Sequence, residues 1–199
     1  MPIEPPRPPP NKRETYARRQ HQFAPSIDGP SKSGLFRRDS ARSQASQQSL
    51  IPPKVRIDGR LPDPPVVTCN EPLPLRILVT RLNESPASIY LELLQVALIA
   101  NTTCRAHELS RSDSTSWVIM SSANMHLPLG TSLDDEIGKE MEIDKGLWNH
   151  LPLPSNVAPS FATCNISRNY FVDINVGLSY GTAGSINVSS SSVYLGMCI

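Results

Sequence analysis

Hydrophobic and polar residues alternate with a period of two along much of the chain after residue 50. The clearest stretch is 166–178, where every second residue from Tyr170 to Leu178 is apolar and most intervening residues are polar. Residues 73–79 show the same pattern over a shorter length. Successive side chains of a strand point to opposite faces, so this period predicts strands with one buried face.

Further strands are predicted where short apolar runs are flanked by polar residues. The segment 89–101 is apolar over most of its length, which fits either a strand covered on both faces or a short buried helix. No strongly amphipathic helix is indicated, and Pro-rich turns separate the strands. The pattern predicts an all-β protein with an antiparallel β-sandwich. The additional strands are expected at 117–120, 136–143 and 186–195.

The first part of the chain has a different composition. Ten of the 20 prolines lie in residues 1–60, where twelve Lys and Arg against five Asp and Glu give a net charge of +7. In the remainder, seven basic residues against thirteen acidic ones give −6, which leaves the chain at +1. A segment this polar buries too little apolar surface to offset the entropy of ordering. We therefore predict a disordered, basic, Pro/Ser-rich leader at 1–50 and one domain at 51–199.

The leader contains two candidate regulatory features. Ser40 follows the pair Arg37 and Arg38 with one residue between, so it is a candidate phosphorylation site. Together with Arg18 and Arg19, these arginines form a candidate basic tether that could approach an anionic membrane surface. No aromatic residues are spaced among the basic ones as stacking platforms, so we expect no nucleic acid partner.

Residue patterns typical of catalysis are absent from the sequence. None of the four histidines lies in a metal-binding or nucleophile motif, and no glycine-rich nucleotide motif or G-x-S-x-G is present. The acidic run at 134–136 lacks the ligand spacing of a calcium loop. The sequence therefore predicts a protein that is not an enzyme, with no catalytic residues, no metal site and no cofactor.

The cysteines and sequons leave two interpretations of the protein's environment. The N-terminal residues do not form a signal peptide, which favours a cytoplasmic protein with reduced thiols. The alternative is a secreted or cell-surface structural sandwich, with two disulfides and glycans on Asn-x-Ser/Thr sequons. The cysteines are Cys69, Cys104, Cys164 and Cys198, and the sequons begin at Asn83, Asn101, Asn165 and Asn187.

Several segments between residues 55 and 199, in their order, carry a resemblance to a known family. They are Arg60–Pro65, Leu73–Val79, Trp117–Ile119, Ile143–Trp148 and, most strongly, Val157–Tyr170 with its core Asn-Ile-Ser-Arg-x-Tyr. This part of the chain resembles the second sandwich domain of fungal arrestin-like proteins. The resemblance implies an immunoglobulin-like, arrestin-type sandwich that binds partners through its surface and edges without catalysis.

The same resemblance implies a biological role. Proteins of this family are similar to adaptors that select membrane cargo for ubiquitin-linked endocytosis or trafficking, so we expect a cytoplasmic protein that can lie at membranes. An arrestin normally has two tandem sandwiches, and this chain resembles only the second, so we expect a truncated form. Many family members recruit ubiquitin ligases through a Pro-Pro-x-Tyr motif that binds WW domains, and this motif is absent here. The resemblance therefore does not imply ligase recruitment by this motif.

Overall fold

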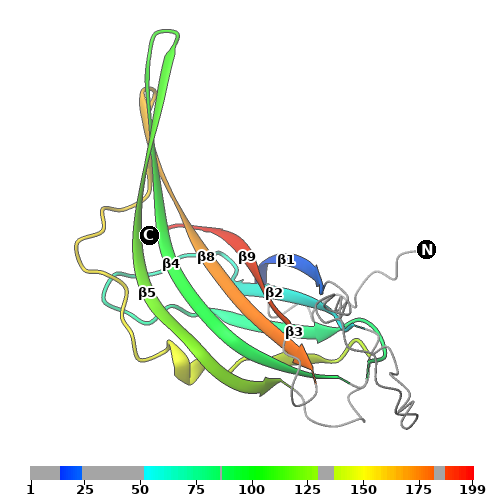
Figure 1. Cartoon of the computed structure of the whole chain (residues 1–199). Coiled ribbons are helices and arrows are strands. Elements are labelled where there is room, and N and C mark those ends of the chain that lie inside the picture. The colour runs from blue at the N-terminus through cyan, green and yellow to red at the C-terminus, as the bar shows by residue number, and fades with distance from the viewer. Residues whose placement is uncertain (1–13, 24–51, 86, 130–136, 182–186) are drawn as a thin grey trace, which may run out of the picture.

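The computed structural model describes residues 14–23, 52–85, 87–129, 137–181 and 187–199, and Figure 1 shows them as an assembly of strands. One 3₁₀ turn, Lys145–Leu147, interrupts them, and these residues contain no α-helix. Consequently no helix among them is long and apolar enough to span a membrane. The strands are β1 (Glu14–Gln22), β2 (Lys54–Pro62), β3 (Arg76–Arg81), β4 (Ser88–Ala106), β5 (Leu109–Leu129), β6 (Glu140–Glu142), β7 (Phe161–Ala162), β8 (Ile166–Gly181) and β9 (Asn187–Met197).

The strands form two antiparallel sheets. The first has the order β1-β2-β3-β6, and the second has the order β5-β4-β8, with β7 and β9 both paired to β8. Side chains from the two inner faces pack together, so the molecule is a β-sandwich. The prediction of an all-β, antiparallel, two-sheet fold is therefore confirmed.

The core is built from the apolar faces of the alternating strands. Ile57 on β2 and Ile77 on β3 are fully buried, as are Leu98 on β4 and Ile174 on β8. The segment 89–101, which the sequence left open between strand and helix, lies within β4. Its apolar content reflects burial, because one face lies in the core and the other is mostly half-buried.

Gly59 on β2 lies where the two sheets pack closely. A Cβ atom at this position would lie 2.6 Å from Cδ1 of Ile174 and 2.8 Å from Cδ1 of Leu195. Both distances are shorter than van der Waals contact, so a larger residue here would force these side chains of β8 and β9 to shift.

The prediction of a disordered leader is wrong for residues 14–23. Residues 14–22 form β1, which pairs with β2 along its whole length, and Phe23, just after it, is buried with its ring 4.7 Å from that of Tyr180. The error arose because composition was averaged over 60 residues, which hid one short strand that ends in an aromatic anchor. The rest of the expected leader, residues 1–13 and 24–50, lies outside the described residues.

β4, β5 and β8 are the longest strands, and the twisted hairpin of β4 and β5 projects from one end of the sandwich (Figure 1). β8 pairs with β4 as far as Cys104, so the hairpin is two-stranded only beyond that residue. The predicted strand at 117–120 is only the middle of β5. The predicted strand at 136–143 is reduced to the three residues of β6, which follow a turn at Gly138 with φ of +88°. The predicted last strand is confirmed as β9.

Candidate interaction surface

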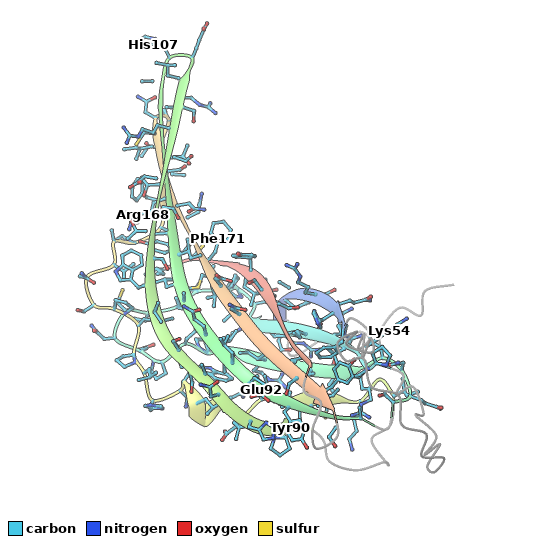
Figure 2. All side chains as sticks on the ribbon, in the orientation of Figure 1. Lys54, Tyr90, Glu92, His107, Arg168 and Phe171 are labelled. Carbon is cyan, nitrogen blue, oxygen red and sulfur yellow. The ribbon has the colours of Figure 1, made fainter. Side chains whose placement is uncertain are left out.

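The ribbon, defined here as residues 101–116, projects from one end of the sandwich, and Figure 2 shows His107 at its tip. The last cross-strand pair is Ala106 with Leu109, so His107 and Glu108 form a two-residue turn. His107 has φ of +53°, a backbone conformation typical of tight hairpin turns. Every residue from Cys104 to Ser116 is exposed. The ribbon is thus an ordered hairpin with almost no core of its own.

Polar side chains link the two strands of the ribbon. The hydroxyl oxygens of Thr103 and Ser112 lie 3.0 Å apart, and the Ser114 hydroxyl donates to Asn101 Oδ1 at 2.9 Å. Each of these pairs is directly opposite in the strand register. Such cross-strand pairs stabilise a sheet by a few tenths of a kcal/mol to about 1 kcal/mol each. They explain how a sequence with few apolar residues forms a ribbon here.

The root of the ribbon is braced by Arg168 on β8. Its Nε donates to the Tyr170 hydroxyl at 2.7 Å, and its Nη1 donates to Thr102 Oγ1 at 3.1 Å. The Tyr170 hydroxyl in turn donates to the carbonyl oxygen of Ala158. This chain of hydrogen bonds joins β4, β8 and the loop before β7. It also explains why a charged residue interrupts the otherwise apolar inner face of β8.

Charged side chains on the ribbon lack ion-pair partners. Arg105, Glu108, Arg111 and Asp113 are exposed, and none forms an ion pair with any described residue. Arg111 and Asp113 lie two residues apart on one strand, so they share a face of the ribbon. Exposed, unpaired charges of both signs on a projecting element can pair with a binding partner.

On the outer face of the first sheet, by contrast, the charges satisfy one another. The Asp58 carboxylate is fully buried beneath Arg18, Arg56 and Arg60, whose guanidinium nitrogens lie 2.9–3.4 Å from its oxygens. The hydrogen bond with Asp58 raises the pKa of Arg18. Glu14, Glu140 and Glu142 continue the network, and hydrogen bonds to Arg76 lower the pKa of Glu142. This face is cross-linked rather than open for binding.

The predicted basic tether is divided by the structure. Arg18 and Arg19 lie in β1, where Arg18 binds Asp58 and Arg19 donates to the carbonyl oxygen of Ser192 at 3.2 Å. Arg37, Arg38 and the candidate phosphorylation site Ser40 lie outside the described residues. The first pair is thus engaged in holding β1 to the sandwich, while the role of the second group stays a prediction.

A polar cluster lies at the opposite end of the second sheet from the ribbon tip, where Figure 2 labels Tyr90 and Glu92. The Ser179 hydroxyl donates to Glu92 Oε1, and His126 Nδ1 lies 2.9 Å from the same oxygen. The His126 ring stacks on Tyr90 at 4.3 Å. These hydrogen bonds lower the pKa of Glu92. The serine contacts the carboxylate and not the imidazole, so the cluster lacks the serine–histidine contact of a nucleophilic site.

The four cysteines are all free thiols in the structure, and three of them are exposed. The fourth, Cys69, is half-buried and donates weakly to the carbonyl oxygen of Val157 at 3.7 Å. The side chain of the sequon residue Asn83 is occupied, because it accepts from the Lys54 amide and donates to the carbonyl oxygen of Pro52. The alternative of a secreted, disulfide-bonded and glycosylated sandwich stays a hypothesis.

Within the described ranges, no group of three or more His, Cys, Asp or Glu residues is arranged to hold a metal ion. Neither a scan against protein-family models nor a search of curated proteins finds a match for this chain.

The ribbon was missed at the sequence level for a clear reason. Its β5 half reads Ser110-Arg-Ser-Asp-Ser-Thr-Ser116, which has no apolar residue and so no hydrophobic period. The alternation of serine with larger side chains was the one available signal, because it also has a period of two. Hydrophobic patterning detects buried strands, and this one is exposed on both faces.

Proposed function

We propose that this chain is a non-catalytic protein-interaction module and that the ribbon is its main binding surface. The observation that carries the proposal is the projection of an ordered hairpin whose residues 104–116 are all exposed. Beyond the pair that Cys104 forms with Ile166 on β8, the hairpin is two-stranded, and such a ribbon is marginally stable in water without packing partners. An element of this kind is well suited to binding, since its backbone and its charges are both accessible.

The free edge of β5 supports this proposal. β5 is the outermost strand of the second sheet, so every second residue directs its N–H and C=O groups away from β4. An extended peptide can add a strand to such an edge through main-chain hydrogen bonds. The unpaired side chains of Arg111 and Asp113 would then select among peptides by their charge.

We further propose that the module acts as an arrestin-like adaptor for membrane cargo in ubiquitin-linked endocytosis or trafficking. The support for this finer role is the sequence resemblance together with a two-sheet antiparallel sandwich. In this role the protein is cytoplasmic and touches anionic membranes peripherally through Arg37 and Arg38. A ubiquitin ligase is a further expected partner, though no Pro-Pro-x-Tyr motif is present to recruit it.

A shortened ribbon tests the binding surface. Deleting Cys104, Arg105, Ser110 and Arg111 removes two cross-strand pairs and keeps the turn. Because an even number of pairs is lost, the alternation of the remaining backbone groups is preserved. Cross-linking mass spectrometry on cells expressing each variant compares the partners captured.

We expect the partners of the full chain to be lost on shortening and to be retained by the matched control Lys139→Ala, which alters an exposed residue outside the ribbon. Both variants are first checked for an unchanged thermal melt. An unchanged partner set in the shortened variant contradicts the ribbon as the binding surface.

Membrane contact is tested separately by co-sedimentation with neutral and anionic lipid vesicles at low salt. The double variant Arg37→Ala and Arg38→Ala is preferable to deletion of residues 1–50, which would also remove β1. Loss of binding to anionic vesicles alone supports the basic tether. Equal binding to both kinds of vesicle, or no effect of the substitutions, argues against it.

A further inference from the structure

The direction of the backbone groups along the ribbon follows from one hydrogen bond. The Arg105 amide donates to the carbonyl oxygen of Asn165 at 2.7 Å, so Arg105 directs its N–H away from β5. Its opposite residue on β5 is Ser110. In an antiparallel ladder the two residues of such a pair both direct their backbone groups outward. Ser110 therefore presents its N–H and C=O at the free edge.

The alternation of inward- and outward-directed backbone groups continues along the ribbon. The register shifts in the β4–β5 pairing lie at Leu91/Leu93 and Val96/Ala97, which are outside the ribbon. Alternation is therefore unbroken, and Ser112 and Ser114 also direct their backbone groups outward. Natural sheets usually protect such an edge with charged side chains, proline or a bulge. The stretch 109–116 has no proline and no bulge, and its two charges, Arg111 and Asp113, are of opposite sign. A small serine occupies each outward-directed position.

We propose that this edge pairs with the same edge of a second copy, antiparallel, about a two-fold axis through Ser112. The inference rests on the ribbon being an interaction surface, as proposed above, and adds the identity of its occupant. Around this axis Ser112 lies opposite its own copy, and Ser110 lies opposite Ser114 of the second copy. The outward-directed backbone groups then bond across the axis, as closed two-fold symmetry requires.

Charge complementarity selects this centre over the others. Ladder pairing requires outward-directed residues to lie opposite one another, so the axis can pass through any residue from Ser110 to Ser114. An axis at Arg111 or at Asp113 places that charged side chain opposite its own copy, which destabilises the pairing. Only the axis at Ser112 places Arg111 opposite Asp113 of the second copy, and symmetry repeats that pair. An axis at Ser110 places Arg111 opposite Leu109, and one at Ser114 places it opposite Trp117. Directly opposite side chains of opposite charge stabilise strand pairing.

The position of the axis also keeps the two bodies apart. Ser112 is close to the tip of the ribbon, so pairing extends from about His107 to Trp117, and each sandwich lies beyond the tip of the other copy (Figure 1). The shared surface is confined to two strands. An interface this small gives a weak dimer whose population depends on protein concentration.

Sedimentation equilibrium of the full chain over a range of concentrations tests the proposal. A reducing agent is included because three of the cysteines are exposed. We expect a monomer–dimer equilibrium for the natural sequence. Arg111→Glu and Asp113→Arg should each weaken the dimer by about tenfold, because each turns two attractive pairs into repulsive ones. The chain carrying both substitutions restores opposite charges and should recover the natural dimer affinity.

Mixing the two single variants gives the sharpest result. One presents two acidic side chains and the other two basic ones, so a heterodimer should form more strongly than either homodimer. Ser112→Pro removes an outward N–H and leaves the β4–β5 ladder intact, since proline is tolerated at such an edge position. The matched control is Ser112→Ala, which also removes the hydroxyl contact with Thr103 but keeps the outward N–H. Ser112→Pro should abolish the dimer while melting at the temperature of Ser112→Ala.

A chain that stays monomeric at every concentration overturns the proposal, as does a dimer that neither single reversal weakens. If the full chain is monomeric but the shortened variant still loses its cellular partners, self-pairing is overturned and the proposed function stands. If the shortened variant keeps both its partners and its dimer, both proposals are overturned.

Discussion

The guanidinium of Arg18 binds the buried carboxylate of Asp58, with Nε 2.9 Å from Oδ1 and Nη2 3.2 Å from Oδ2. The two residues are 40 positions apart and lie opposite each other in the β1–β2 pair. Asp58 is fully buried although it points to the outer face of its sheet, because arginine side chains cover it. One carboxylate thus fastens β1 to β2.

Replacing Asp58 with alanine should destabilise the protein strongly. The change leaves Arg18, Arg56 and Arg60 facing one another without the carboxylate that they share. Removing one member of a buried ion pair costs about 3–5 kcal/mol, and the partial exposure of these arginines favours the lower end. Urea unfolding measures the loss, with Asp63→Ala at an exposed position as control. A loss equal to that of the control would show that the network contributes nothing to stability.

Phe23 should be required for a stable sandwich. Its side chain is 1% exposed and packs against His21 and Tyr180. Truncation of a buried phenylalanine to alanine costs about 3–5 kcal/mol. We expect Phe23→Ala to lower the melting temperature, and a chain consisting of 51–199 alone to melt lower still or aggregate. If 51–199 melts as the full chain does, β1 is dispensable and the domain boundary near residue 50 is right after all.

The alternation of apolar and polar residues predicted the buried strands. It did not predict the strands that are exposed on both faces or that bury only one or two side chains. β8 was predicted because its inner face from Tyr170 to Leu178 is apolar at every second position. The segment 14–23 has one large apolar anchor, Phe23. Its attachment to β2 also depends on the ion pair of Arg18 with Asp58, which sequence alone does not reveal.

The candidate site was less predictable than the fold. Free edges and projections depend on which strands pair, and pairing depends on contacts between distant residues such as Cys104 and Ile166. The exposed ribbon sequence has the composition of a loop. Arg168 could be recognised as a break in an apolar face, but its bond to Thr102 required the structure.

Gly59→Ala should be destabilising in spite of the small size of the change. The new methyl group would overlap Cδ1 of Ile174 and Cδ1 of Leu195, so both side chains must move. Overpacking of this kind costs about 1–3 kcal/mol. Gly196→Ala is the matched control on β9, because its nearest neighbouring atom would lie 3.9 Å away. Thermal unfolding of both variants measures the difference, and equal stabilities would contradict the close approach of the sheets.

Glu92→Gln should remove part of the protein's sensitivity to acid. Hydrogen bonds from Ser179 and His126 lower the pKa of Glu92 below its ordinary value of 4.5. The unfolded chain then binds more protons, so this stabilisation is present above pH 4.5 and is lost as pH falls through the folded pKa. Natural and variant chains should differ by on the order of 1 kcal/mol at neutral pH and converge in acid. Urea midpoints across about pH 3–7 measure this, and a constant gap would refute it.

Asp173→Asn should have the opposite effect, because burial raises the pKa of Asp173 above its ordinary value of 3.8. The residue lies on the outer face of β8, opposite Ala97 and Tyr194, and its Oδ1 has no hydrogen-bond partner among the described residues. The folded chain therefore binds more protons, and the destabilisation is present above the folded pKa and disappears as pH falls below 3.8. The asparagine side chain carries no charge to desolvate, so the substitution should stabilise the protein by roughly 0.5–1 kcal/mol at neutral pH. The same urea series run on both variants tests the sign directly: a destabilised Asp173→Asn variant at neutral pH would mean that the carboxylate has a favourable partner in solution.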